Sequence, residues 1–555
     1  MDTGLKVPRS YFNIPFGLQL DARFGSCYPV FRKIMYPGDV FKIHADLLIR
    51  YLPMLTPPMN DCVATVRFGF VPLRLIEPNT ELIITGSKDG KMSTQTLPKF
   101  DSCFKECSTG IEYSVNEKHS LLDYLYQIPV ITDSLTDELK AKLEASPSTP
   151  AAYFAKAYAR FWWDYYRDEN LYSVSDFNQF VGIVLSSANE VNSSILPKYL
   201  KKDYFTSSLP WQLKAVSAPR VPIIGSGTFT GSGLNFSDSL FAASTIGGTD
   251  DLQTPSFGAG SIEYPFDTGD NTDNERFNTT LTRELEKGKA TGSVSITNVG
   301  FTGADVRDIM AQTRIYERLA RCGSRYTEYL RANFGVAPRD DTMQRAQYIG
   351  GFKTKIVTTE VVQTAGAGDN PVGTLRGHGI THGMSTIPTF MAKEIGVIIG
   401  ILDVMPETIY AKGVDRELTA RSRFDFMNPS FQHLSEQEVR KGEIYFGVDT
   451  DSSGNLKNDE TWGFQPMYQE LRKGVKHLCG DMRDSLSYWN QALIPGSRPS
   501  LNNSFISGQN HTSEFNRPFA VSNQNAYPMV IDFGGVIEAY RPLVKSGTPG
   551  LIDHN

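Results

Sequence analysis

The chain has 555 residues and a formal net charge of −6, which argues against a generally basic nucleic-acid binder. Hydrophobic residues make up 40% and charged residues 21% of it, with 47 Gly, 31 Pro, 33 Phe and 25 Tyr. This composition is typical of a turn-rich, mainly β or irregular chain and excludes a helical bundle. A sizeable core is expected, whereas length alone does not fix the number of domains.

The first 16 residues lack the apolar core of a signal peptide, and no stretch approaches the roughly 20 apolar residues of a membrane helix. We therefore expect a soluble protein, made in a cytosol, without membrane insertion. The six cysteines are scattered over a long chain, which favours reduced thiols over a disulfide framework: Cys27, Cys62, Cys103, Cys107, Cys322 and Cys479.

Two strands are predicted near the start of the chain. Residues 1–30 have little periodicity and are expected to form an arm laid over the fold. Apolar residues alternate with polar ones over 41–51 and again over 64–70, so each segment predicts a strand. The proline-rich connection between them suits a sandwich whose chain steps from one sheet to the other better than a simple hairpin.

The next regions differ in composition. Residues 77–150 read as an insertion with a buried piece at 121–126. Residues 151–220 read as a helical insertion, because an aromatic stripe with helical spacing predicts a core-facing helix: Phe154, Tyr158, Phe161, Trp162 and Tyr165. Residues 221–303 are rich in Gly, Ser, Thr, Asp and Asn and cannot build a large core of their own.

Regular patterns return after residue 303. Residues 304–335 form a predicted helical block, interrupted at Gly323, with an apolar side: Val306, Ile309, Met310, Tyr316, Leu319 and Ala320. Alternation over 395–401 predicts another strand, and 528–540 predicts the last one.

Several blocks in one order resemble a known family. They are PGD to FGFVPLRL at 37–75, RDENL at 167–171, DYFTSSLPWQ at 203–212, the ER-AR-G-RY, FGV, QR and GG pattern at 317–351, SEQEVRKGEIYF at 435–446, WGFQP to GDMR at 462–483, and RPLVKSGTPGLIDH at 541–554. Together they resemble the major capsid proteins of the Microviridae, small single-stranded DNA phages, within their gokushovirus branch. The chain departs from the pattern at Ala346, where Pro is expected, at Ile349, where Leu is expected, at Ser435, where Gly is usual, and at Pro466-Met467, where Glu-Arg is expected.

The resemblance implies a fold and a function. The implied fold is an eight-stranded antiparallel jelly roll, a single capsid domain over residues 1–555 that carries the insertions named above. The implied function is a structural subunit that self-assembles into a small T=1 icosahedral shell around circular single-stranded DNA, in the virion, after assembly in the host bacterial cytoplasm. Other virion proteins and a host surface receptor are the further expected partners. The alternative from another class is a jelly-roll carbohydrate-binding or carbohydrate-active protein.

The sequence contains only weak candidates for catalytic or metal-binding residues. We therefore expect no enzymatic activity, no cofactor and no metal. His378 and His382 have metal-ligand spacing only on a helix, and the flanking glycines favour a loop. Cys103 and Cys107 lack a second Cys or His pair. The carboxylates Asp164, Asp168 and Glu169 are expected to be solvated or to pair with a helix. An arginine cluster is expected to pair within the chain or line a subunit interface, with nucleic-acid contact as the weaker alternative: Arg314, Arg318, Arg321, Arg325 and Arg331.

Two low-specificity sites follow from charge and composition. A minor inner patch for single-stranded DNA is predicted at Lys6, Arg9, Arg32 and Lys33, with stacking from residues such as Tyr11 and Phe12. Residues 221–275 hold eight acidic residues and no Lys, Arg or His, so they carry the negative balance of the chain. We expect a protrusion there that meets the host through Phe229, Phe236, Phe241, Phe257, Tyr264 and Phe266; packing on neighbouring copies is the alternative.

Overall fold

The computed structural model describes residues 8–86, 97, 119–127, 138, 142, 146, 151–172, 195–214, 303–323, 325–362, 364, 372–432, 434, 436–521 and 526–546. The chain forms two compact units, Met1–Lys214 with Tyr316–Asn555, and Ala215–Ile315. Within the second unit the description covers residues 303–315, the first part of helix α7 (Gly303–Cys322). All other elements given below belong to the first unit.

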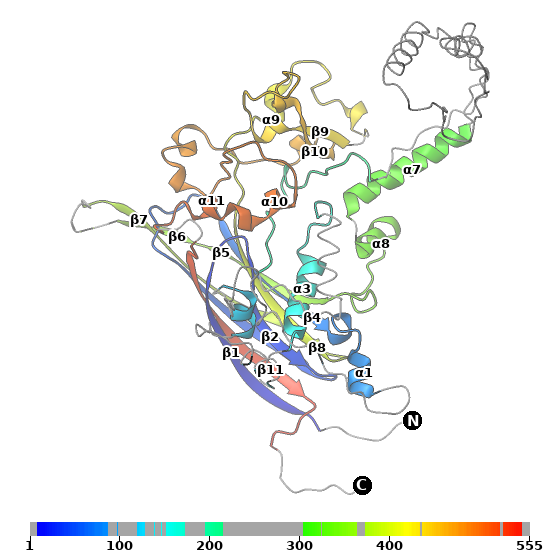
Figure 1. Cartoon of the computed structure of the whole chain (residues 1–555), viewed down its shortest axis with the longest axis vertical. Helices are drawn as coiled ribbons and strands as arrows, with labels where there is room; N and C mark the ends of the chain where they lie inside the picture. Colours follow the sequence, from blue (N-terminus) through cyan, green and yellow to red (C-terminus); the bar gives the residue numbers. More distant parts are fainter. Residues whose placement is uncertain are drawn as a thin grey trace, which may run out of the picture. The chain divides into compact units, whose positions relative to one another are not determined.

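One layer of the first unit is a five-stranded antiparallel sheet in the order β1-β11-β3-β7-β6 (Figure 1). Its strands are β1 (Ser10–Ala22), β11 (Met529–Arg541), β3 (Val40–Tyr51), β7 (Leu375–Met391) and β6 (Thr358–Val362). Every second side chain of β3, from Phe41 to Tyr51, is buried, which confirms the predicted strand.

The facing layer is a four-stranded antiparallel sheet in the order β2-β8-β4-β5. Its strands are β2 (Cys27–Met35), β8 (Gly396–Pro406), β4 (Cys62–Pro72) and β5 (Gln347–Ile356). Aromatic rings from both layers meet in the core, where the centroids of Phe16 and Phe31 lie 4.8 Å apart. Because β3 and β4 belong to different sheets, the chain steps between layers at its proline-rich connection, as predicted.

The two sheets are joined on one side by a continuous stretch of chain. Val357 alone separates β5 from β6, so the chain leaves one sheet and enters the other at this point. The Val357 amide donates to Thr381 Oγ1 on β7 at 3.0 Å. This antiparallel sandwich confirms the predicted mainly β fold of jelly-roll type. The predicted count of eight strands is not confirmed, because β6 adds a ninth strand to the two sheets.

Helix α3 (Tyr153–Tyr165) covers the four-stranded sheet on its outer face. Its Tyr158 hydroxyl donates to the carbonyl of Cys27 at 2.7 Å, and its Trp162 Nε1 donates to the carbonyl of Pro197 at 2.7 Å. With a sheet on one face and α3 on the other, β8 is buried along its whole length and is a nearly continuous apolar run, interrupted by Asp403, which pairs with Arg67 and Lys198. The aromatic stripe therefore faces the core, as predicted.

The remaining elements are shorter. They are α1 (Thr80–Thr85), the π-helical turn η3 (Leu122–Tyr126), α8 (Tyr326–Phe334), β9 (Glu436–Arg440), α9 (Lys441–Ile444), β10 (Thr461–Pro466), α10 (Asn503–Ile506) and α11 (Thr512–Asn516). Single 3-10 turns occur at Leu73–Leu75, Arg416–Thr419, Pro429–Phe431, Lys457–Asp459, Gln469–Leu471, Gly480–Arg483, Ser487–Trp489 and Gly508–His511. Among the described residues, none of the helices is long and apolar enough to span a membrane.

Two predictions about the sheets are wrong. The expected arm at residues 1–30 contains β1 and the start of β2, and the inward residues of β1 pack against the core. The expected loop around His378 and His382 is part of β7, where glycines are needed on the inner face. A Cβ at Gly379, for example, would lie 2.4 Å from the Tyr51 ring.

The predicted helical block at 304–335 is largely correct. Gly323 (φ +92°) ends α7 and α8 follows. The predicted apolar side of α7 is not buried within the chain, however: Ala320 is buried, but Met310 is 65% exposed. Residues 121–126 contain the predicted buried piece, with Leu121, Tyr124 and Leu125 buried.

Candidate nucleic-acid interface

A groove lies at the open side of the sandwich, between the two edge strands β1 and β2. Its cavity volume is ≈ 500 Å³, within the range of ligand-binding clefts. Side chains of β1, β2, η3, α3 and β11 line it. The apolar lining exists because the inward residues of β1, such as Ile14 and Leu18, have no neighbouring strand beyond the edge to cover them fully.

Arg32 and Lys33 of β2 bring positive charge into this groove. The Arg32 guanidinium donates to Gln127 Oε1 at 3.3 Å and lies 5.9 Å from the centroid of the Phe154 ring. Burial lowers the pKa of Arg32, although a guanidinium keeps its charge at neutral pH. Within the described part of the chain, neither Arg32 nor Lys33 forms an ion pair with a carboxylate. With respect to the residues that the structure describes, the groove therefore keeps two uncompensated cations.

Arg541 also lines the groove, but its charge is balanced. Its Nε and Nη2 donate to the two carboxylate oxygens of Asp39 at 3.2 and 2.8 Å, and the Asp39 side chain is fully buried. This pair ties the end of β11 to the turn before β3. Sequence reasoning missed Arg541 because its role depends on strands that are distant in the sequence.

Arg9 lies at the same end of the β1–β11 pair, since its neighbour Ser10 pairs with Arg541. The Arg9 side chain is exposed, and its Cζ lies 5.9 Å from the centroid of the Tyr540 ring. Tyr11 and Tyr540 are direct cross-strand partners and are 51% and 43% exposed. Phe12 points the opposite way and packs, partly buried, against the core, so its predicted stacking role stays a prediction. Lys6 lies outside the described residues.

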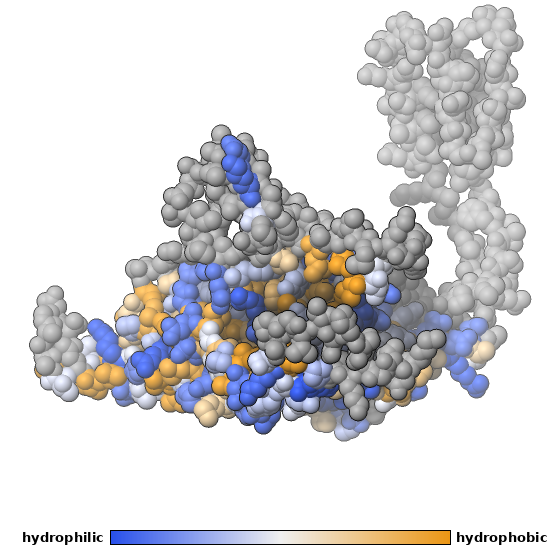
Figure 2. All heavy atoms as spheres, turned by 90° about the horizontal axis from the view of Figure 1, so that it is seen from below, coloured by the Kyte–Doolittle hydropathy of each residue, from blue (hydrophilic) through white to orange (hydrophobic). Residues whose placement is uncertain are grey.

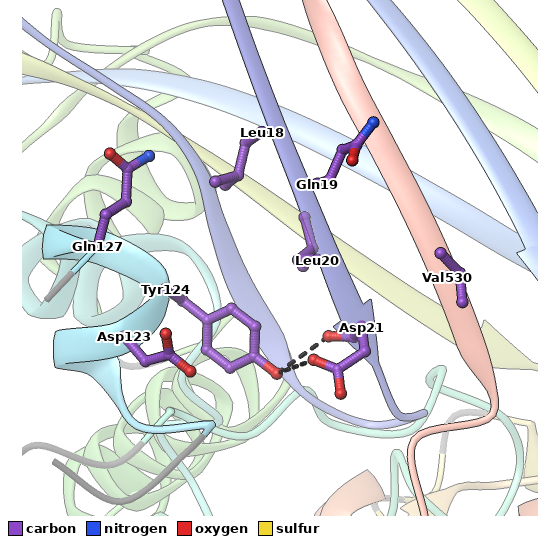
Figure 3. Close-up of a pocket in the computed structure, with 8 residues that line it drawn as sticks. All are labelled: Leu18, Gln19, Leu20, Asp21, Asp123, Tyr124, Gln127 and Val530. Carbon is purple, nitrogen blue, oxygen red and sulfur yellow. Dashed lines mark hydrogen bonds between the residues drawn. The ribbon is translucent and has the colours of Figure 1, made fainter. Parts of the chain in front are cut away.

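A second cavity of ≈ 460 Å³ lies further along β1, and Gln127 of the η3 region lines both (Figure 3). There the Tyr124 hydroxyl donates to Asp21 Oδ1 at 2.9 Å, and His119 Nε2 lies 2.8 Å from Asp21 Oδ2. Burial raises the pKa of Tyr124, so it remains a hydroxyl donor. With Asp21 and Asp123 in its lining, this second cavity disfavours phosphate.

The other candidates have structural partners. His382 pairs with Asp46 across two strands at 2.6 Å, and His378 lies four residues away on the same strand. No cluster of three or more metal-ligating side chains occurs among the described residues. Cys103, Cys107 and all six predicted host-contact residues lie outside them.

The carboxylates near the end of α3 hold neighbouring segments. Asp164 accepts from Arg160 Nε at 3.0 Å and from the Ala346 amide at 2.9 Å, and Asp168 pairs with Lys202. Asp164 thus acts as a helix partner, the second of the two predicted alternatives, whereas Asp168 holds the segment around Lys202.

Part of the arginine cluster pairs within the chain. Arg321 Nε donates to Glu436 at 2.7 Å, and Arg325 Nη1 lies 3.0 Å from Glu169 and 3.2 Å from Glu328. Among the described residues, Arg318 and Arg331 form no ion pair, so the cluster is only partly compensated.

Comparison with known proteins identifies the family. The family described as "Capsid protein (F protein)" of phages matches residues 3–551. The chain belongs to this family of phage capsid proteins. This confirms the predicted resemblance to the Microviridae capsid proteins and favours the structural function over the carbohydrate-related alternative.

Three relatives support the same assignment over almost the whole capsid protein. It is 27% identical to capsid protein VP1 of Chlamydia phage 1, with 98% of this chain and 96% of the relative covered. It is 26% identical to capsid protein VP1 of Bdellovibrio phage phiMH2K, with 98% and 95% covered. It is 25% identical to capsid protein VP1 of Spiroplasma virus 4, with 99% and 97% covered. The capsid protein is therefore a component of a virion built from identical subunits.

Proposed function

We propose that the capsid protein encloses circular single-stranded DNA in a small icosahedral shell and contacts the DNA through the groove between β1 and β2. The observation that carries this proposal is the pair of uncompensated cations, Arg32 and Lys33, in that groove. Arg9 extends the same patch at the end of the β1–β11 pair, and the proposal keeps Lys6, which precedes it in the sequence. A local patch suffices, because neutralising a few phosphates needs no overall positive charge.

The groove suits a nucleotide chemically. Its cations match phosphate oxygens, while its apolar walls and the exposed rings of Tyr11 and Tyr540 near Arg9 offer stacking surfaces for bases. The acidic second cavity repels phosphate, which directs the DNA backbone to the Arg32 end of the open side.

The test is single-stranded DNA binding by purified subunits at several salt concentrations. Neutralising two phosphate-contacting cations in Arg32→Gln/Lys33→Gln should weaken binding and reduce the log–log salt slope by about 1.4. The control is Lys353→Gln/Arg472→Gln, which removes two exposed cations from outside the groove lining. Equal slopes for the two double variants would contradict the proposed site.

We further propose that residues 221–303 project from the shell and meet a host surface receptor. The eight acidic residues of 221–275, without any cation, support an exterior position because packaged phosphate would repel them. Replacing 225–275 by a short Gly/Ser linker should preserve assembly and DNA content but abolish adsorption to host cells. Loss of particles would instead support packing on neighbouring copies.

The C-terminal tail is proposed to dock on neighbouring copies, with assembly in the host cytoplasm alongside other virion proteins. Leu543 and Val544 are 55% and 45% exposed after the last strand, so they gain cover only from another surface. Truncation after Tyr540 would remove the Arg541–Asp39 pair as well as the tail. Truncation after Arg541 keeps that pair, removes Leu543 and Val544, and is therefore the cleaner test. It should leave folded subunits that form few or no shells; normal particle yields would refute the role.

A further inference from the structure

The capsid protein presents an unusual density of apolar side chains in one loop between β8 and β9. We define the apolar loop as residues 416–432. Exposed hydrophobic residues occur elsewhere too, and Figure 2 shows them scattered among hydrophilic ones on one face. In the apolar loop, however, four large side chains are more than half exposed: Leu418 (77%), Phe424 (59%), Phe426 (61%) and Met427 (55%).

Hydrogen bonds fix this loop although its rings face outward. Asp425 Oδ2 accepts the amides of Arg421 and Ser422 at 2.9 and 2.7 Å. The Asn428 amide donates to the Tyr468 hydroxyl at 3.0 Å, and its side chain accepts from the Ser430 amide at 2.9 Å. The polar groups of the loop thus anchor it to the subunit, while its apolar groups gain nothing from the subunit's own core.

The loop is also anchored at its start, and its charges are balanced. Arg416 Nη1 donates to the carbonyl of Glu438 and lies 3.4 Å from Glu443 Oε1. Within the loop, the charges of Arg421 and Arg423 are matched in number by those of Glu417 and Asp425. An apolar centre with a balanced polar rim is the composition of a protein–protein interface and is poorly suited to a nucleic-acid backbone.

The exposed area agrees with this reading. Four large side chains with more than half of their surface exposed present on the order of 400 Å² of mostly apolar area, within the range of the largest apolar patch on a typical monomer, which is often functional. A stable interface buries about 800 Å² on each partner, so the loop could form the central part of one interface. In a shell of identical subunits, each subunit is surrounded by other copies of itself. The partner at the highest local concentration is therefore another copy.

We propose that the apolar loop docks on a second copy of this chain in the assembled shell, with Phe424 and Phe426 as its central anchors. The inference rests on the assembly of identical subunits. Membership of the capsid family does not say which segments form the contacts between subunits, and the proposal assigns one of these contacts to the apolar loop.

A photo-crosslinking amino acid at position 426 tests the identity of the partner in purified particles. Irradiation should give a product of twice the 61.7 kDa mass of one chain, and peptides from two copies should be joined at residue 426. Dissociated subunits should give no such product. A crosslink to a different polypeptide or to DNA, or no crosslink in particles, would overturn the proposal.

The double variant Phe424→Ser/Phe426→Ser tests the energetic role. Its thermal unfolding should match that of the wild type because the side chains are exposed, but the subunit concentration needed for assembly should rise at least tenfold. Ile380→Ser/Met384→Ser, on the outer face of β7, is the matched control, with exposures of 43% and 71%. Wild-type subunits that never assemble would refute the proposed function itself, whereas wild-type-like assembly of the Phe424/Phe426 variant would refute only the loop.

Discussion

The ring of Phe161 on α3 occupies the space beside Gly69 on β4. A Cβ at residue 69 would lie 2.2 Å from Phe161 Cε2, so no other residue fits without moving the helix. We expect Gly69→Ala to destabilise the subunit by about 1–3 kcal/mol through overpacking. Denaturant unfolding measures the change, and Gly17→Ala on β1 is the control because nothing lies within 4 Å of its Cβ position. Equal stabilities of the two variants would contradict the packing described.

The ion pair between Lys156 and Glu77 lies deep beneath α3. The Nζ–Oε2 distance is 3.5 Å, and the two side chains are 1% and 4% exposed. Lys156→Met should cost about 3–5 kcal/mol because Glu77 keeps a buried charge without its cation. Replacing both residues in Lys156→Met/Glu77→Leu should recover most of that loss. In contrast, Lys142→Met in the exposed pair with Glu138 should change the free energy of unfolding by less than about 1 kcal/mol.

Glu436 gives a pH-dependent prediction. Burial raises its pKa, and Arg321 opposes that shift. The folded protein therefore holds the proton more tightly than the unfolded chain, so this group's contribution to stability falls as pH rises through the window above the ordinary glutamate pKa. Removing the cation in Arg321→Met should enlarge the effect.

The measurement is the unfolding free energy of Arg321→Met and wild type at two pH values. The deficit of the variant should be about 1–3 kcal/mol near neutral pH and smaller at about pH 4.5, because Glu436 takes up its proton as the pH falls. Arg331→Met, which removes an α8 cation that has no ion pair among the described residues, should show no such pH dependence. A deficit of Arg321→Met that is independent of pH would contradict the role assigned to Glu436.

Ala346 occupies a position where the family pattern has proline. Unlike proline, alanine has a backbone N–H that can donate a hydrogen bond. This N–H donates to Asp164 Oδ2 at 2.9 Å, in a buried position. Ala346→Pro removes that donor, so we expect a loss of about 1–3 kcal/mol. Asp164→Asn tests the same bond from the acceptor side. The two variants should be non-additive in a double-mutant cycle; full additivity would show that the bond contributes nothing.

Strong periodicity made part of the fold predictable from sequence. The alternation in β3 and the aromatic stripe of α3 each reflect one face packed on a core, and both predictions are confirmed. The strand at β1 was missed although Phe12, Ile14, Phe16 and Leu18 alternate, because Pro15 and Gly17 interrupt the pattern. Proline is tolerated there since β1 is an edge strand.

The groove was only partly predictable. Arg32 and Lys33 were identified from charge alone, and the structure brings them to one cavity. The sequence carried no sign that Arg541 would join them or that Asp39 would compensate its charge, because that pair joins residues about 500 positions apart in the chain. The uncovered rings of the apolar loop follow no periodic pattern, so they become visible only when burial is known.

The position of β11 in the five-stranded sheet has a consequence for synthesis. The strand closest to the C-terminus lies between β1 and β3, so these two N-terminal strands have no common neighbour until residues 529–541 leave the ribosome. Pairing Ser10 with Arg541 closes a very long loop, which makes this step late and slow in folding. An incomplete nascent chain therefore lacks a finished subunit surface.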